Sequence, residues 1–360
     1  MSNYSFILSN YIKPDFIYTN DSSCNCSLID DKILLSCWRN FTFINFYFRK
    51  KYEKDIGRHI WFNNTLWSDS KLYNINENNT NFIKFLTKTT DHNLKSCGCE
   101  DFRVIEWQNK NYALYSKIEV PFSVYKEHFC EIDENLNIKN DKEFKTNNRI
   151  EKNWQPIEIY PFECVYSYKP FKTINLKTNQ FKEYKNNICN DNYRGSSQVI
   201  SYKDKLICIV HKRNETDKYH YYTHYFAIFD KQMNLLKITK PFSFTGADIE
   251  FCTFMKRING KITILMSVYD QLTFKFEIED DLIDSIIDDK LNNSSINKNL
   301  HDDLYKLAKE NKNYTTAICM ATFSTNKNLI EDAIKLNYSS TISKDKKIIL
   351  QKILIEKYKG

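Results

Sequence analysis

An acidic pair and an arginine stand together at Glu100–Arg103, directly before an apolar run that ends at Trp107. A polar turn and a second apolar run, Tyr112–Ile118, follow, and this order predicts a β-hairpin. The start of the hairpin would present a carboxylate and a guanidinium to a shared cavity. A carboxylic acid in a partly dry cavity can donate a proton in catalysis, because burial raises its pKa. The alternative is that these side chains cap a turn and pair with one another.

Four other polar motifs also precede strand-like runs, one before the Glu100 motif and three after it. They are Asn25-Cys26-Ser27-Leu28, Lys152-Asn153-Trp154, Arg194-Gly195-Ser196-Ser197 and Asp248-Ile249-Glu250. Repeats of this kind are typical of β-propellers, in which radially arranged sheets leave only short edges. The innermost strand of each blade lines a central channel, so a polar motif at each blade start would converge on one cavity. The sequence therefore predicts an all-β fold, a five-bladed β-propeller, with a polar site at its centre.

Composition agrees with a β-rich fold of one large domain or two ordinary ones. The 360 residues include 25 Phe and 24 Tyr, whose rings pack well on half-buried pleated surfaces. Gly and Pro number only 6 each, so Asn fills many of the turn positions. After residue 280, apolar residues recur at helical spacing. We therefore predict a propeller over residues 1–285 and a helical C-terminal tail over 286–360. The tail would pack on the propeller, mediate self-association into a homo-oligomer or contact another partner.

Charge, apolar runs and cysteine spacing argue against several classes of function. The 52 Lys and Arg against 45 Asp and Glu, a net charge of +7, are not gathered into the basic stripe of nucleic-acid binders. No run approaches the roughly 18 apolar residues of a membrane span, and Met1–Asn20 lacks the apolar core of a secretory signal. The 11 cysteines are scattered, and the pairs Cys24/Cys26 and Cys97/Cys99 are spaced more closely than zinc ligands. We expect a cytoplasmic protein with reduced thiols, no metal, no nucleic-acid partner and no membrane span.

Taken in order, the five motifs resemble those of glycoside hydrolase family 130, the five-bladed propeller enzymes that cut or make mannosides. They also resemble related glycosyltransferase-associated propeller proteins of bacteria and large viruses. Glu100-Asp101-Phe102-Arg103 is similar to the family's Glu-Asp-Pro-Arg signature. Three later pairs of segments are similar to the family's third, fourth and fifth motifs. In this order, they are Glu151-Lys152-Asn153-Trp154 with Tyr166-Ser167-Tyr168-Lys169-Pro170, Arg194-Gly195-Ser196-Ser197 with His211, and Ile249-Glu250-Phe251 with Tyr269-Asp270.

By this resemblance the chain breaks or forms glycosidic bonds as an inverting phosphorylase, a transferase or a hydrolase, with a β-mannoside-like substrate. Asp101 takes the place of the general acid, while Glu250 and Asp270 would position sugar hydroxyls or activate water. A cationic ring would bind phosphate or a nucleotide-sugar pyrophosphate; its members are Arg39, Arg103, Lys152, Arg194 and His211. The other expected binding residues are Glu100, Asn153, His224 and Tyr225. The resemblance implies no cofactor, inorganic phosphate or a nucleotide sugar as co-substrate, and an oligosaccharide or sugar donor as the partner.

Departures from the family pattern leave a second interpretation open. Phe102 and Cys26 replace prolines of the pattern, and the motif at Arg194 lacks a second glycine. Such drift is compatible with a catalytically inactive propeller that binds glycans or supports glycan assembly. A scaffold for protein partners is the third alternative, and the polarity of the channel motifs argues against it.

Overall fold

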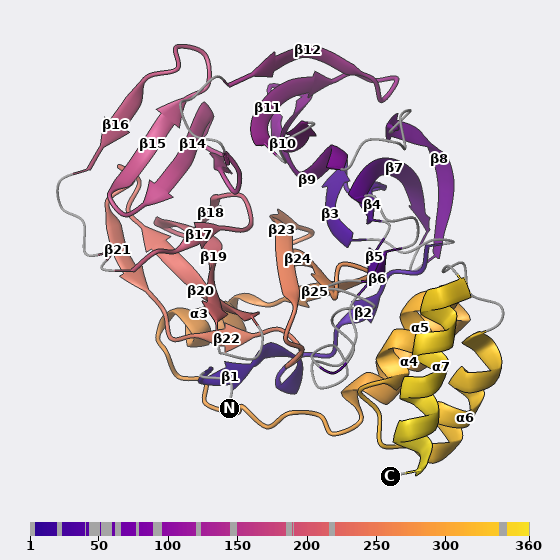
Figure 1. Ribbon diagram of the computed structural model, residues 1–360. Helices are drawn as coiled ribbons and strands as arrows, with labels where there is room; N and C mark the ends of the chain where they lie inside the picture. Colours follow the sequence, from indigo (N-terminus) through magenta and orange to yellow (C-terminus); the bar gives the residue numbers. More distant parts are fainter. Residues whose placement is uncertain are drawn as a thin grey trace.

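The computed structural model describes residues 4–19, 24–39, 41–42, 51, 60–61, 66–76, 79–88, 96–119, 124–144, 150–184, 189, 191–215, 220–337 and 344–359. Among them, strands predominate up to Ile278 and helices from Asp280 onward. This confirms the predicted mostly β fold with helices at the C-terminal end. Figure 1 shows the sheets arranged around a common centre, with a bundle of helices outside them.

The largest sheet has eight strands and consists of two four-stranded halves. One half contains β3 (Cys24–Ile29), β4 (Ile33–Arg39), β7 (Leu66–Asn76) and β8 (Asn79–Thr87). The other half contains β9 (Ser96–Trp107), β10 (Lys110–Glu119), β11 (Val124–Ile132) and β12 (Ile138–Glu143). The two halves meet where β7 and β9 pair in parallel, with Ser68 opposite Gly98.

The remaining sheets carry the other polar motifs. One consists of β13 (Gln155–Ile157), β14 (Tyr160–Tyr168), β15 (Phe171–Asn175) and β16 (Phe181–Glu183). A seven-stranded sheet contains β17 (Arg194–Gly195), β18 (Ile200–Tyr202), β19 (Lys205–Glu215), β20 (His220–Phe229), β21 (Leu235–Ile238), β22 (Phe242–Ser243) and the N-terminal β1 (Phe6–Ile7). The last four-stranded sheet contains β23 (Glu250–Ile258), β24 (Lys261–Val268), β25 (Leu272–Ile278) and the N-terminal β2 (Asp15–Phe16). A separate pair joins β5 (Phe41–Thr42) to β6 (Ile60–Trp61).

The strands that carry or follow the polar motifs contact one another near the centre of the arrangement. Strand β3 contacts both β9 and β23, β9 contacts β13, and β18 contacts β23. The N-terminal strands lie at outer edges instead, because β1 pairs with β22 and β2 pairs with β25. The N-terminal strands therefore complete the two sheets that are built from the last strands along the sequence.

The predicted hairpins have turns that match their sequences. Gln108 and Asn109 connect β9 to β10 with φ of 50° and 57°, and Asn259 and Gly260 connect β23 to β24 with φ of 49° and 83°. Two successive residues with positive φ are typical of the type I′ turn, whose twist suits a two-residue β-hairpin. Asn and Gly tolerate this conformation best, so these turns follow from local sequence.

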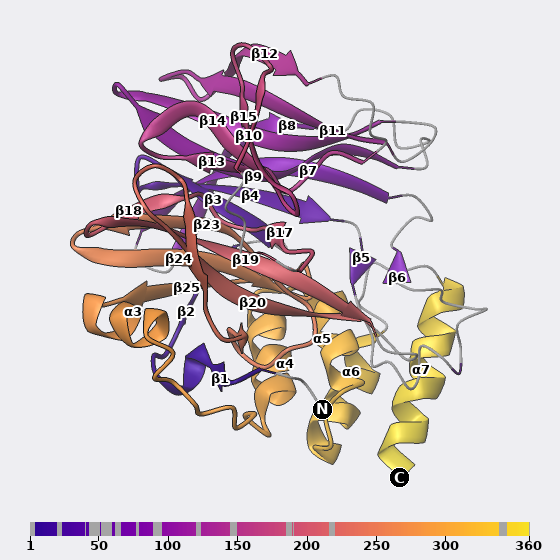
Figure 2. The ribbon, with the colours of Figure 1, turned by 90° about the vertical axis from the view of Figure 1, so that its left-hand side faces the viewer.

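The first C-terminal helix begins where apolar residues start to recur at helical spacing in the sequence. Helix α3 (Asp280–Ile287) packs against β20. After a segment without helix, α4 (Leu300–Glu310), α5 (Tyr314–Ala321), α6 (Lys327–Leu336) and α7 (Lys344–Lys359) form one bundle at the periphery of the sheets (Figures 1 and 2). Buried residues of this bundle, such as Ile318, belong to the same hydrophobic cluster as Phe226 and Ile264 in the sheets. Within the described helices, none is long and apolar enough to cross a membrane.

Candidate functional site

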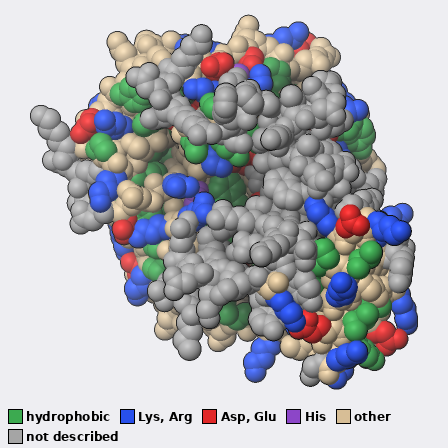
Figure 3. Space-filling view, in the orientation of Figure 1, with side chains coloured by type: hydrophobic (Ala, Val, Ile, Leu, Met, Phe, Trp, Pro, Cys, Tyr) green, Lys and Arg blue, Asp and Glu red, His purple; other side chains and the backbone are tan. Residues whose placement is uncertain are grey.

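A cavity of about 790 Å³ is lined by residues from each of the five motif regions. Its described lining carries four cationic side chains against two carboxylates, an excess that attracts anions. The cations are Lys152, Lys169, Arg194 and Arg213, and the carboxylates are Asp101 and Asp270. Figure 3 shows basic side chains and a histidine gathered around a hollow near the middle of this face. Six aromatic side chains also line the cavity: Tyr125, Tyr166, Tyr168, Tyr193, Tyr222 and Phe251.

Asp101 lies at the cavity with its side chain held by a hydrogen bond. Asp101 is only 2% exposed, and the Asn25 amide donates a hydrogen bond to its Oδ1 at 2.5 Å. The Ser267 hydroxyl donates in turn to Asn25 Oδ1 at 2.8 Å, which fixes the orientation of the amide. Both Asn25 and Asp101 have positive φ, 48° and 59°, a conformation that non-glycine residues adopt when the surroundings impose it. Backbone and side chain together therefore aim this carboxyl group.

We expect Asn25→Ala to lower turnover by about tenfold to 100-fold, because a loosely held acid is misplaced relative to the bond that it protonates. The measurement is kcat on any glycoside that the wild type turns over. Asn111→Ala is the matched control, since Asn111 makes a similar bond to Asp30 at 2.9 Å on an exposed part of the β9–β10 hairpin. Equal effects of the two substitutions would contradict a positioning role for Asn25.

Arg103, expected among the phosphate-binding residues, lies behind the cavity instead. Its side chain is fully buried, and it is not among the described residues that line the cavity. Its Nε donates to the Ser196 carbonyl at 2.6 Å and its Nη1 to the Asp101 carbonyl at 2.9 Å. The guanidinium therefore joins two motif segments and supports the backbone of Asp101. Because these bonds use its Nε and Nη1 donors, fewer donors remain for a ligand.

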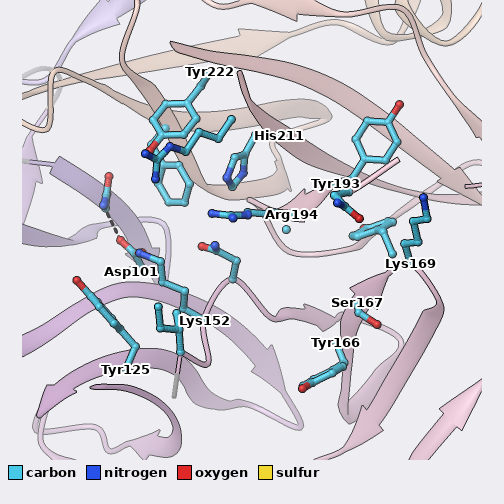
Figure 4. A pocket seen from close by; sticks show the side chains of 18 of the residues that line it. Asp101, Tyr125, Lys152, Tyr166, Ser167, Lys169, Tyr193, Arg194, His211 and Tyr222 are labelled. Atoms are coloured by element: carbon cyan, nitrogen blue, oxygen red, sulfur yellow. Dashed lines mark hydrogen bonds between the residues drawn. The ribbon is translucent and has the colours of Figure 1, made fainter. Parts of the chain in front are cut away.

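Arg194 and His211 lie on paired strands and reach the cavity together. They are partners in the β17–β19 register, and Figure 4 shows their side chains next to each other. His211 Nδ1 lies 2.8 Å from the Ser196 hydroxyl. Burial, followed by the neighbouring His224 and Arg194, holds the pKa of His211 well below its usual value. The imidazole is therefore neutral near pH 7 and offers a hydrogen bond rather than a charge.

Lys152 and Asn153 enter the cavity from the segment before β13. Figure 4 shows Lys152 beside Asp101, and its ammonium lies 4.6 Å from the centre of the Tyr125 ring. Asn153 has φ of 69°, and its buried Oδ1 makes no hydrogen bond within the described part of the chain. Because a buried amide oxygen without a partner is costly, this atom is suited to accept a hydrogen bond from a bound ligand.

Glu151, next to these residues, organises an aromatic wall of the cavity. Its carboxylate accepts hydrogen bonds from Trp154 Nε1 at 3.2 Å and from the Tyr166 hydroxyl at 3.1 Å. Tyr166 lines the cavity, whereas Trp154 is 1% exposed and packs against Phe144 and Tyr166. The motif Glu151–Trp154 thus supplies one supporting carboxylate, two cavity residues and one core tryptophan.

Glu250, a predicted catalytic partner, is fully buried away from the described lining of the cavity. Its Oε1 accepts from the Thr245 amide and hydroxyl, at 2.7 and 2.6 Å. Its Oε2 accepts from the Ser243 hydroxyl and the Phe244 amide, both at 2.8 Å. These four bonds use the carboxylate to hold the segment after β22 against β23. Glu250 therefore lies behind the cavity, whereas Asp270 lines it.

Three of the other predicted binding residues also lie outside the described lining of the cavity. Glu100 is 4% exposed and accepts from the Ser68 hydroxyl at 3.3 Å. His224 is fully buried between phenylalanine rings, and burial lowers its pKa to about 3. Tyr225 packs edge-on against Tyr193, 5.0 Å between ring centres, and so supports a cavity residue. The side chain of Arg39 lies outside the described residues.

Several lining residues were not predicted as site residues from the sequence, although local patterns indicate some of them. Arg213 lies two residues after His211 on β19, and strand alternation places both side chains on one face. Tyr222 is the partner of Arg213 in the neighbouring strand, and its ring lies 5.4 Å from that of His211. Lys169 and Tyr193 lie in connections after β14 and before β17, where no periodic pattern indicates orientation.

Comparison with known proteins yields matches in solved structures alone. No protein-family model matches the chain, and no curated protein matches it in sequence. Its structure is similar to that of a glycoside hydrolase of the GH130 family of mannoside phosphorylases that targets β-1,2 mannosidic linkages in Candida mannan. The TM-score is 0.50 at 11% identity, over 73% of this chain and 86% of that one.

Two further structures show a similar but weaker likeness. A β-1,2-mannobiose phosphorylase from Listeria innocua matches with a TM-score of 0.49 and 9% identity, over 77% of this chain and 93% of that one. MPT-1, a GDP-Man-dependent mannosyltransferase from Leishmania mexicana, matches with a TM-score of 0.49 and 11% identity, over 75% and 92%. These two carry no weight of their own; the likeness to the GH130 glycoside hydrolase, with its TM-score of 0.50, supports the resemblance at the level of the fold.

Proposed function

We propose that the chain is a five-bladed β-propeller enzyme that breaks or forms glycosidic bonds, with a β-mannoside-like substrate and Asp101 as the general acid. The five blades would be the two halves of the eight-stranded sheet, the sheet of β13–β16, the seven-stranded sheet and the sheet of β23–β25. The assignment to carbohydrate chemistry draws on the fold of the structural neighbours, which include mannoside phosphorylases, hydrolases and a mannosyltransferase.

One observation carries the proposal: the carboxyl of Asp101 shares a cavity with Lys152, Arg194 and His211. Figure 4 shows Asp101 and Lys152 on one side of this cavity and Arg194 with His211 on another. A positioned acid can protonate a leaving oxygen, while cations bind and orient an anionic co-substrate. Tyrosine rings and the Asn153 amide offer the stacking surface and the hydrogen-bond acceptor that a sugar needs.

In phosphorolysis, Asp101 would donate its proton to the glycosidic oxygen as the bond from that oxygen to the anomeric carbon breaks. A phosphate oxygen would attack the same carbon from the opposite face and form a sugar 1-phosphate with inverted configuration. Lys152 and Arg194 would hold the phosphate, and the neutral His211 would add a hydrogen bond. The reverse step, or attack by a sugar hydroxyl on a nucleotide sugar, would use the same groups.

Phe102, which stands where the family pattern has proline, does not by itself argue against activity. Its side chain is fully buried in the interior of the sheet and stacks on Tyr115, with ring centres 4.5 Å apart. It is not among the described residues that line the cavity. An aromatic side chain at this position therefore leaves the cavity open, because it packs in the core and does not line the cavity.

A screen of β-mannosides with phosphate, water or nucleotide sugars, followed by product analysis, tests the proposal. We expect turnover with one of these acceptors and an anomerically inverted product. If sugars bind but no member of a broad panel is turned over, the chain is a glycan-binding propeller instead. If neither binding nor turnover occurs, a carbohydrate function is wrong.

We expect Lys152→Met and Arg194→Gln each to weaken binding of inorganic phosphate by about tenfold to 100-fold. The reason is that a charge-assisted hydrogen bond contributes roughly 1.5–3 kcal/mol. Isothermal titration calorimetry at low and high salt measures the loss, which should shrink as salt screens the charges. Lys203→Met and Arg257→Gln are matched controls, because these residues pair with Asp284 and Asp280 outside the cavity. A loss of affinity in the controls equal to that in the cavity variants would contradict a phosphate site here.

A further inference from the structure

The turn between β24 and β25 carries Asp270 into the cavity in a costly conformation. Tyr269 and Asp270 have φ of 54° and 56°, and both are non-glycine residues. The Tyr269 amide donates to the Ile249 carbonyl at 2.9 Å, and the Gln271 amide donates to the Val268 carbonyl at 3.1 Å. Tyr269 is the unusual residue of this turn, because a bulky aromatic residue rarely adopts positive φ unless its surroundings impose it.

Helix α4 and Phe323, in the connection between α5 and α6, hold the first residue of this turn. The Tyr269 hydroxyl lies 3.0 Å from His301 Nε2, and Tyr269 is 1% exposed. Phe323 stacks on His301, with ring centres 4.5 Å apart at an interplanar angle of 8°, and also contacts the Tyr269 ring. Burial lowers the pKa of His301 to about 4, so its ring is neutral near pH 7 and its Nε2 can accept a hydrogen bond from the Tyr269 hydroxyl.

Helix α5 holds the last residue of the turn. Gln271 is fully buried, and its Oε1 accepts from the Thr316 hydroxyl at 3.2 Å and from the Asn313 amide at 3.4 Å. Asn313 is also the N-cap of α5, since its Oδ1 accepts from the Thr316 amide. Side-chain hydrogen bonds from Asn313 and Thr316 to Gln271 therefore connect the start of this helix to the turn.

We propose that helices α4 and α5 are a buttress of the cavity: they fix the Tyr269–Gln271 turn and thereby place the Asp270 carboxylate where it binds the hydroxyl groups of a sugar. His301, Thr316 and Phe323 are positioning residues, because none of them lines the cavity within the described chain. A carboxylate is a strong acceptor for sugar hydroxyls, and Asp270 shares the cavity with Asp101. The role of Asp270 rests on the proposed function, whereas the hold on the turn does not depend on it.

The test combines Thr316→Val with His301→Phe, which remove the polar anchors and keep the shapes of the side chains. We expect backbone amides of residues 269–272 to exchange hydrogen about tenfold faster in this double variant. We also expect KM for the sugar to rise by roughly threefold to tenfold, as for the loss of one hydrogen bond, with little change in kcat. Asp270→Asn should give a similar KM, and adding it to the double variant should cause no further rise, since both changes act on one contact.

Asp332→Asn is the matched control within the same bundle. Asp332 accepts from the Tyr305 hydroxyl and from Lys309, contacts that join α4 to α6 without involving the turn. It should lower the midpoint of thermal unfolding but leave both KM and exchange of the turn unchanged. Unaltered exchange in the anchor variant would overturn the buttress, and so would a KM effect that adds in full to that of Asp270→Asn. If the wild type turns over no glycoside, the proposed function fails, while the exchange measurement still decides whether the helices hold the turn.

Discussion

Asp101→Asn is expected to reduce turnover by about 10²- to 10⁴-fold, the usual contribution of a positioned general acid. Asparagine has the same shape and still accepts the Asn25 amide, and Arg103 still binds the backbone carbonyl at this position. The variant keeps the geometry of the cavity and loses only the transferable proton. The measurement is kcat on the substrate that the screen identifies, together with the dissociation constant of the same sugar.

Binding is the decisive companion of that measurement. Sugar affinity should stay within a few-fold of the wild type, and affinity for phosphate should not fall, because the substitution adds no negative charge beside Lys152. Glu106→Gln is the matched control: Glu106 lies on the same strand, and its exposed carboxylate pairs with Lys256. Retention of most of the wild-type turnover by Asp101→Asn would exclude this residue as the general acid.

Gly98→Ala is expected to destabilise the fold by about 4 kcal/mol or more and to lower the thermal midpoint by about 10 °C. Gly98 has φ of 117°, and an added Cβ would lie 2.2 Å from the Ser68 carbonyl oxygen and 2.8 Å from the Ser68 nitrogen. These are backbone atoms of the parallel β7–β9 pair that joins the two halves of the largest sheet. Relief of the clash requires that the strands move apart.

Gly260→Ala separates this clash from the cost of the backbone conformation. Gly260 also has positive φ, 83°, but nothing lies within 4 Å of the added Cβ in its turn. We expect a loss of about 1–2 kcal/mol there, the cost of a left-handed residue with a side chain. Thermal and denaturant unfolding of both variants provide the comparison. Equal losses at the two sites would mean that β7 and β9 do not pair as closely as described.

The core of the candidate site follows from the motifs. Asp101, Lys152, Asn153, Arg194, His211 and Asp270 were predicted and all line the cavity. Asp101 and His211 lie within β9 and β19, and the others lie in or next to β13, β17 and β24, so the strands that carry the motifs bring them together. Glu250 and Arg103 belong to the same motifs but point behind the cavity, where they bond to loops and carbonyls. The angle at which each motif meets its neighbour decides this, and local pattern does not encode that angle.

The amino-acid sequence by itself determined the hairpins, their type I′ turns, the mostly β fold and the helical C-terminal end. These features depend on side-chain alternation and on residues that accept positive φ, which act over a few positions. Tertiary structure alone decided which motif residues reach the cavity, and that Lys169 and Tyr193 join them. It also decided that α4 and α5 fasten the turn beside Asp270. Such contacts join residues far apart along the chain, because burial of apolar faces brings the helices and sheets together and sets the distances between their polar groups.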